Sequence, residues 1–132
     1  MSDFQLPEDL QYTRDDEWVK SEPDGHYRVG ITDYAQQQLG DIVFVELPSP
    51  GDTFEAGQPF GVVESVKAVS DLFAPTSMEI LEVNQDLEEA PESINAECYG
   101  IGWLIRVKAT EPEALDQLLD RQGYQKTIEE RS

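Results

Sequence analysis

The stretch FGVVESVKAVSDLF, from Phe60 to Phe73, holds two short apolar runs with a lysine between them. Valine and aromatic residues favour extended backbone, so these runs predict strands over Phe60 to Val66 and Val69 to Phe73. Strands that follow each other this closely pair as an antiparallel hairpin. The stretch therefore predicts a tight hairpin that presents Lys67 at its apex.

Similar short strands, separated by Gly, Pro and Asp turns, are expected on both sides of this hairpin. In one of them, Tyr27, Val29 and Ile31 alternate with polar or small residues, which is the period of a half-buried strand. Many short strands joined by such turns predict a mainly β fold, either a sandwich or a barrel. The other expected strands are Trp18 to Lys20, Tyr27 to Ile31, Ile42 to Leu47, a brief one at Phe54, Glu79 to Val83 and Gly102 to Lys108.

One short helix is expected within the β region. Thr32 can cap a helix over Asp33 to Leu39, because a threonine hydroxyl accepts hydrogen bonds from the free N–H groups of the first turn. Gly40 then supplies the C-terminal stop, since glycine readily adopts the left-handed conformation that ends helices.

A second helix is expected after the last strand. Thr110 and Glu113 have the spacing of a capping box. The following stripe of Leu115, Leu118 and Leu119 predicts a packing face that ends near Gly123. The chain is thus expected to form a single domain, 1–132, with a core of about residues 12–109 and a C-terminal helical segment of about residues 110–132.

The composition of the chain is strongly acidic. It has 132 residues, 28 Asp and Glu against 9 Lys and Arg, and a formal net charge of −19. Such a field repels phosphate backbones and anionic lipids, so neither nucleic acid nor a membrane is an expected partner. The charge suits docking on basic surfaces of larger proteins, or it serves solubility alone. No apolar run could span a bilayer and no targeting segment is recognisable, so a cytoplasmic location is expected.

The chain has one cysteine, Cys98, and one histidine, His26. A lone cysteine cannot form an intrachain disulfide, which fits a reducing compartment. Acidic Glu97 beside it disfavours a reactive thiolate, so a structural role is expected. One Cys and one His far apart in sequence do not build a zinc site of the usual kind, and no metal is expected.

Lys67 is unusual because, between Arg28 and Arg106, the chain has fourteen acidic residues and only this one basic residue. An exposed hairpin lysine needs no function. A catalytic Schiff-base lysine needs a depressed pKa, whereas Glu64 and Asp71 favour the ammonium form. A third interpretation is that another enzyme acylates Lys67, for which presentation at a rigid apex matters more than reactivity. The other lysines, Lys20, Lys108 and Lys126, occur in different local contexts.

Four segments in order, YTRDDEWV, VGITDYAQQQLGDIVFVELP, GVVESVKAVSDLFAPTSMEILEVN and INAECYGIGWLIRV, resemble the H-protein family of the glycine cleavage system. The resemblance runs from about Tyr12 to Tyr124. It implies a lipoyl-domain-like fold, a flattened barrel or sandwich of two antiparallel sheets with one short internal helix and a C-terminal helix. It also implies a carrier rather than an enzyme, with no catalytic residues of its own.

The resemblance assigns roles to four residues. Lys67 is implied to carry lipoate in amide linkage, and Glu64 to be a recognition element for the lipoylating enzyme. Glu17 and Asp71 are implied to border a cleft into which the loaded arm folds, where their charge would stabilise a protonated amine.

The implied partners are the enzymes that load and use the carrier. They are the lipoylating enzymes, the pyridoxal-phosphate-dependent glycine decarboxylase (P protein), the tetrahydrofolate-dependent aminomethyltransferase (T protein) and the flavin-containing dihydrolipoyl dehydrogenase (L protein). The carrier would shuttle the aminomethyl group of glycine between the first two and present a dithiol to the third.

Two positions depart from the family pattern, and several rival functions stay open. Asp16 stands where the family often has histidine, and Met78 stands at a turn where glycine is usual. The rivals are an H-like protein that relays lipoyl groups to other enzymes, a lipoyl domain of a 2-oxo acid dehydrogenase complex, and a β-sandwich interaction protein without cofactor. Lipoyl domains of that second kind centre on DKA and biotin carriers place Met beside the lysine, whereas Val66 and Ala68 flank Lys67 here.

Overall fold

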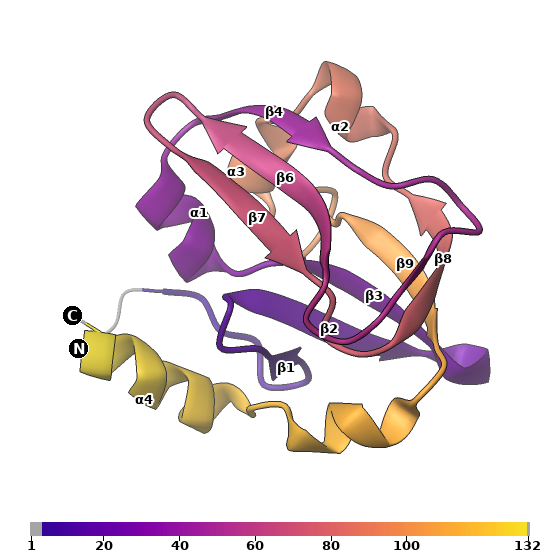
Figure 1. Cartoon of the computed structure of the whole chain (residues 1–132). Helices are drawn as coiled ribbons and strands as arrows, with labels where there is room; N and C mark the ends of the chain where they lie inside the picture. The colour runs from indigo at the N-terminus through magenta and orange to yellow at the C-terminus, as the bar shows by residue number, and fades with distance from the viewer. Residues whose placement is uncertain (1–3, 132) are drawn as a thin grey trace.

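The computed structural model describes residues 4–131, which form two antiparallel sheets (Figure 1). The larger sheet has six strands in the order β1-β2-β3-β9-β8-β5, and the smaller has three in the order β4-β6-β7. The prediction of a mainly β sandwich of two antiparallel sheets is confirmed. The strands are β1 (Gln11–Tyr12), β2 (Glu17–Glu22), β3 (His26–Ile31), β4 (Ile42–Glu46), β5 (Thr53–Phe54), β6 (Pro59–Ser65), β7 (Val69–Phe73), β8 (Met78–Val83) and β9 (Ile105–Ala109).

The predicted strands all occur, with one clear difference at the start of β9. This strand begins at Ile105 rather than at Gly102. The N–H of Gly102 instead donates to the carbonyl of Glu97 at 2.9 Å and closes a loop. A side chain at position 102 would lie 2.7 Å from the carbonyl oxygen of Ser93, so close packing requires glycine there. Met78, at the position where the family often has glycine, is the first residue of β8 and is buried.

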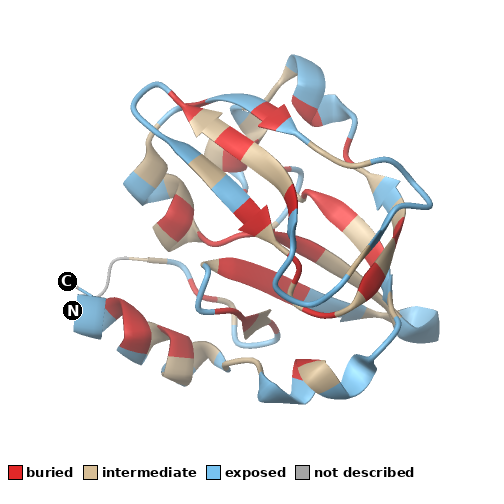
Figure 2. Cartoon of the chain, in the orientation of Figure 1, coloured by how far each residue is buried: buried red, intermediate tan, exposed pale blue. Residues whose placement is uncertain are grey.

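The main hydrophobic core lies between the two sheets (Figure 2). Val19 and Val29 reach it from the larger sheet, and Val45 and Val63 reach it from the smaller one. A second cluster joins the N-terminal segment to the C-terminal helix. In that cluster the rings of Tyr12 and Tyr124 stack with centroids 4.9 Å apart. Burial of both clusters is the main driving force that closes the sandwich.

The expected internal helix is present as α1 (Asp33–Leu39). The hydroxyl of Thr32 accepts from the N–H of Ala35, and Gly40 ends the helix with φ of 81°. Besides the two-residue strand β1, three short helical elements were not predicted: the helices α2 (Asp86–Glu89) and α3 (Ser93–Ala96), and the 3-10 turn η1 (Pro23–Gly25). Each is too short for a 3.6-residue hydrophobic period to show in the sequence.

The prediction for the C-terminal segment was wrong in its details. In place of a helix from Thr110 to near Gly123, the chain forms a 3-10 helix, η2 (Pro112–Gln117), and then α4 (Arg121–Arg131), which contains Gly123. No capping box forms, because the N–H of Thr110 donates to the carbonyl of Ser77 at 2.8 Å. Between the two helices, Leu119 exchanges backbone hydrogen bonds of 2.8 Å with Tyr12, so the chain is extended there. Among the described residues, no helix is long and apolar enough to cross a membrane.

Candidate functional site

Lys67 lies exposed at the tip of the β6–β7 hairpin (Figures 1 and 2). The paired strands end at Glu64 and Val69, so Ser65 to Ala68 form the connection, here called the hairpin tip. The tip projects beyond both sheets, which leaves the lysine accessible to a partner's active site.

Ser65 holds the hairpin tip in one conformation. Its hydroxyl oxygen accepts from the N–H of Lys67 at 3.3 Å and from the N–H of Ala68 at 3.0 Å. Its own N–H donates to the carbonyl of Ala68 at 2.8 Å. The side chain is buried although the tip around it is exposed. Sequence reasoning missed this role, although a serine two residues before the lysine is a typical turn signal.

A second contact fixes the tip relative to the rest of the molecule. The N–H of Val66 donates to the carbonyl of Asp41 at 3.1 Å, just after helix α1 ends. The Lys67 side chain passes over Gly40, since a Cβ built there would lie 3.6 Å from its Cε. The lysine therefore starts from a rigid base and is free only along its own side chain.

Glu64 lies in β6 directly beside the tip. It pairs with Phe44 of β4 on one side and with Val69 of β7 on the other. Directly opposed residues project from the same face of a sheet, so the Glu64 carboxylate stands between two apolar side chains. This position is accessible from outside, and it faces any enzyme that approaches Lys67 over this sheet.

A cleft of about 200 Å³ separates β7 from α1 and from the loop before β2. Its buried lining is apolar and its exposed rim is acidic, with Asp71 and Asp15 on the rim. Together, Asp71 and Asp15 give the opening a negative potential. The lining residues are Asp15, Asp16, Ile31, Ala35, Gln38, Leu39, Val63, Ser70, Asp71 and Leu72.

Glu17 is buried next to the cleft rather than on its rim, with 1% of its surface exposed. One carboxylate oxygen, Oε2, accepts from the N–H of Phe73 at 2.6 Å. Because β7 is an edge strand, this bond replaces one that a neighbouring strand would make. The other oxygen, Oε1, has no hydrogen-bond partner among the described residues. Burial raises the pKa of the Glu17 carboxyl well above its ordinary value, and the Phe73 N–H offsets only part of that effect.

Asp16, which departs from the family pattern, connects the cleft to the C-terminal helix. Its carboxylate accepts from the Tyr124 hydroxyl at 2.9 Å and from the Arg131 guanidinium at 2.7 Å. Its backbone carbonyl accepts from the N–H of Thr32 at 3.0 Å. These bonds hold α4 against the loop before β2. No local sequence signal predicts them, because Asp16 and Arg131 are 115 positions apart.

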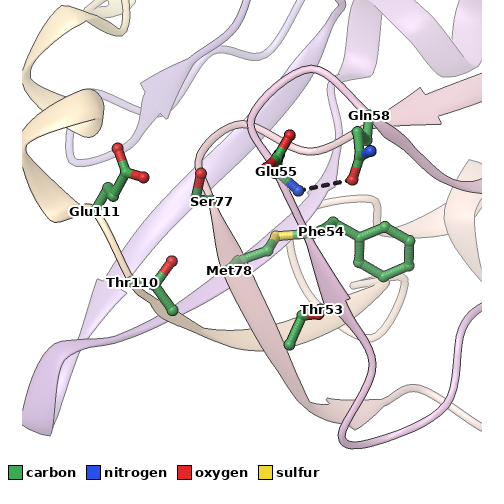
Figure 3. Close-up of a pocket in the computed structure, with 8 residues that line it drawn as sticks. All are labelled: Thr53, Phe54, Glu55, Gln58, Ser77, Met78, Thr110 and Glu111. Carbon is green, nitrogen blue, oxygen red and sulfur yellow. Dashed lines mark hydrogen bonds between the residues drawn. The ribbon is translucent and has the colours of Figure 1, made fainter.

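The cysteine, the possible metal ligands and the other pockets among the described residues offer no comparable chemistry. Burial raises the pKa of the Cys98 thiol to about 12, so it is not a nucleophile at neutral pH. Within residues 4–131, no group of three or more His, Cys, Asp or Glu side chains could hold a metal ion. A larger open pocket of about 490 Å³ lies where β6 begins, at the opposite end of the hairpin from Lys67 (Figure 3). It is lined by Thr53, Phe54, Glu55, Gln58, Ser77, Met78, Thr110 and Glu111.

The chain is similar to proteins from several bacteria over most of its length. Residues 10–131 match the sequence profile of the "Glycine cleavage H-protein" family. The glycine cleavage system H proteins of Shewanella frigidimarina and Shewanella baltica are each 50% identical to the chain over 125 residues, which is 95% of this chain and 97% of each relative. A crystal structure of a glycine cleavage system H protein from Mycobacterium marinum superposes with a TM-score of 0.87 and 44% identity, covering 94% of this chain and 99% of that one.

Proposed function

Because the chain belongs to the glycine cleavage H-protein family, we propose that Lys67 carries the lipoyl group of this carrier as an amide on its Nζ. The protein is a non-catalytic carrier component of the glycine cleavage system. The observation that carries the assignment to Lys67 is its position, exposed on a hairpin tip that Ser65 and Asp41 hold rigid. A rigid base and a mobile arm raise the effective concentration of one carried group at several partner sites in turn.

The partners that we propose act on this arm in sequence. They are the lipoylating enzymes, the glycine decarboxylase, the aminomethyltransferase and dihydrolipoyl dehydrogenase. When bound, the lipoyl group supplies the disulfide chemistry that carries the aminomethyl group together with two electrons. The contribution of this chain is to hold, orient and shield that group. We place the carrier in the cytoplasm, a reducing compartment that suits its single, buried cysteine.

The cleft beside β7 fits an apolar arm with a cationic end. Its buried side chains, among them Ile31 and Leu72, would cover apolar atoms, and the rim would attract a protonated amine. We assign the rim role to Asp71. Burial favours the uncharged form of Glu17, so this residue would contribute a charge once the amine of the arm approaches its buried Oε1, which has no hydrogen-bond partner among residues 4–131. Glu64 is assigned to recognition by the lipoylating enzyme, because it stands beside Lys67 on an accessible face.

Peptide mapping of protein purified from its native host tests the attachment site. We expect one lipoyl amide, on Lys67. A lipoyl group on Lys20, Lys108 or Lys126 instead would contradict the assignment. Recombinant protein made without lipoate is unsuitable, because its Lys67 can stay unmodified when no lipoate is supplied.

The variant Lys67→Arg tests the function. Arginine keeps the charge at an exposed position, where substitutions change the free energy of unfolding by less than about 0.5 kcal/mol. We expect a normal fold and no glycine–bicarbonate exchange with the decarboxylase, whereas lipoylated wild type supports exchange. Activity retained by Lys67→Arg would exclude the carrier mechanism, and lipoylated wild type that supports no exchange would favour a lipoyl relay role.

A further inference from the structure

Exposed apolar side chains gather around Lys67. Among the described residues, the large hydrophobic side chains that remain exposed are Val43 (51%), Phe44 (49%), Val66 (71%), Val69 (66%) and Ile101 (58%). All but Ile101 belong to the small sheet or to its hairpin tip. Isolated exposed apolar residues need no explanation, but a group of them beside one functional residue indicates an interaction surface.

The strand register explains how these residues come together. Phe44, Glu64 and Val69 face one another across β4, β6 and β7, so they form one row on the same face of the sheet. The register shifts between Ile42 and Phe44, which is a β-bulge. Such a bulge redirects side chains, and here both Val43 and Phe44 are exposed. Val66 extends the apolar surface onto the hairpin tip, directly next to Lys67.

We propose that the exposed side chains of Val43, Phe44, Val66 and Val69, here called the apolar row, form together with Glu64 the docking surface for the enzyme that acylates Lys67. This inference rests on the proposed function, because it names the partner of the same lysine. It extends recognition from the single carboxylate of Glu64 to an apolar surface that contains it.

The length of the Lys67 side chain indicates why the acylating enzyme, rather than a later partner, binds this surface. Before acylation, only the lysine side chain separates Nζ from the hairpin backbone, so an enzyme that brings an acyl group to this nitrogen must cover the residues beside it. After acylation, the lipoyl arm would add to the reach of the side chain, so later enzymes would not need to contact β4 to bind its end. The surface next to the unmodified lysine is therefore expected to bind the enzyme that acylates Lys67.

The acylation reaction also requires a partner that favours the uncharged form of the Lys67 amine. The Lys67 ammonium gives up two protons as Nζ forms a C–N bond to the carbonyl carbon of an acyl adenylate. The C–O bond to the phosphate breaks and AMP leaves with the bonding electrons. Burial of the ammonium against an apolar surface favours its neutral, nucleophilic form.

The charges around the row define the complementary surface of the enzyme. Exposed Asp41, Glu46 and Asp71 lie on the same strands or adjoin them, and Lys67 is the only basic residue in this part of the chain. The partner surface should therefore have an apolar centre with a cationic rim. The apolar contacts supply affinity, and the charges guide the approach.

The test compares a double variant with a matched control. Phe44→Thr with Val69→Thr removes the apolar side chains on both sides of Glu64 and places threonine, which suits strands, at both positions. Ile101→Thr removes an equally exposed apolar side chain outside the small sheet. Each protein is acylated by a purified ATP-dependent lipoate–protein ligase with lipoate and ATP, and the product is followed by intact mass. Thermal unfolding establishes that all variants fold.

We expect kcat/KM for acylation of the double variant to fall about tenfold or more, mainly through KM, as when central apolar interface residues are truncated. The Ile101→Thr control should react like wild type. The affinity of the ligase for Lys67→Arg protein, which cannot be acylated, should fall similarly when the double substitution is added.

The outcomes separate this inference from the proposed function. If wild type is not acylated at Lys67, the proposed function fails. If wild type is acylated and the double variant reacts equally fast, the docking surface is wrong while the function stands. A double variant that is acylated normally but binds the decarboxylase less tightly would also overturn the inference, because the surface would then serve that enzyme.

Discussion

At the scale of single residues, Glu17 stands out because it buries a carboxylate where an uncharged side chain would cost less. The Phe73 N–H satisfies one oxygen, and the other has no partner within residues 4–131. A buried polar atom without a partner costs about 1–3 kcal/mol. Such a cost is tolerated where the group has a function, which here is the proposed electrostatic role beside the cleft.

Glu17→Gln should stabilise the protein at neutral pH. The carboxyl of Glu17 has a raised pKa in the folded chain, so the folded state resists ionisation more than the unfolded state does. The stability of wild type therefore falls as the pH rises from the ordinary carboxyl range towards the raised folded pKa. Glutamine keeps an acceptor for the Phe73 N–H and does not ionise. We expect a gain at neutral pH of roughly 1.4 kcal/mol for each unit by which the folded pKa of Glu17 exceeds the unfolded one.

Urea unfolding between acidic and neutral pH measures this effect. The advantage of Glu17→Gln should shrink as the pH falls below the ordinary pKa of a glutamate, because both states of wild type are then protonated. Glu88→Gln, the same substitution at an exposed position whose charge is not among those that raise the pKa of Glu17, is the control and should not reproduce this trend in the free energy of unfolding. A constant difference between Glu17→Gln and wild type across the series would contradict the role of ionisation.

At the scale of structural elements, the β6–β7 hairpin does most to position the candidate site. Its tip depends on the buried hydroxyl of Ser65 and on the bond from the Val66 N–H to the Asp41 carbonyl. Ser65 accepts two tip N–H groups and also donates to the carbonyl of Ala68 at 3.3 Å. The hydroxyl thus has little capacity left for water, and its bonds are all local. A rigid tip limits the conformations that a partner must select before it can bind Lys67.

Ser65→Ala should loosen the tip without unfolding the sheet. The loss of these hydrogen bonds should cost about 1 kcal/mol, since the freed amides of Lys67 and Ala68 can turn to water. We expect faster hydrogen exchange at those two amides and a lower kcat/KM for acylation of Lys67. Ser70→Ala is a matched control in the same hairpin, because the Ser70 hydroxyl makes only a long contact of 3.4 Å with the neighbouring carbonyl of Asp71. Equal exchange and acylation rates in both variants would show that Ser65 does not order the tip.

At the scale of the whole molecule, the net charge of −19 sets the long-range field. Acidic residues lie both near the candidate site and far from it. Helix α2, which carries Glu88 and Glu89, lies near β4 and the small sheet, whereas η2 lies on the opposite side of the molecule (Figure 1). Ions at physiological strength screen charges beyond about 8 Å, so only carboxylates near a contact guide association strongly.

Reversal of charge near the small sheet should slow partner binding more than reversal elsewhere. We expect Glu88→Lys with Glu89→Lys to lower the association rate with the decarboxylase and the aminomethyltransferase, and to reduce its salt dependence. Glu113→Lys with Asp116→Lys, in η2, changes the net charge equally and is the control. Stopped-flow binding over a salt series is the measurement. An association rate of wild type that does not change with salt would leave solubility as the only role of the acidic composition.

The features that depend on neighbours along the chain could be predicted from the sequence. Strand alternation, the Thr32 cap, the Gly40 stop and the β6–β7 hairpin with Lys67 at its tip are all local, so short-range patterns predict them. The family resemblance likewise rested on short ordered motifs, and the similarity to known H proteins confirms it.

The features that depend on long-range contacts became visible only in the folded chain. The partner of Glu17 is 56 positions away, and the bonds of Asp16 to Arg131 span 115 positions. The capping box at Thr110 failed for the same reason, because the amide of Thr110 found the Ser77 carbonyl on another segment. Local propensities are worth a fraction of a kcal/mol per residue, so a tertiary hydrogen bond or a buried contact overrides them where the chain closes on itself. The apolar row beside Lys67 is likewise visible only when the strand register brings Phe44, Glu64 and Val69 side by side.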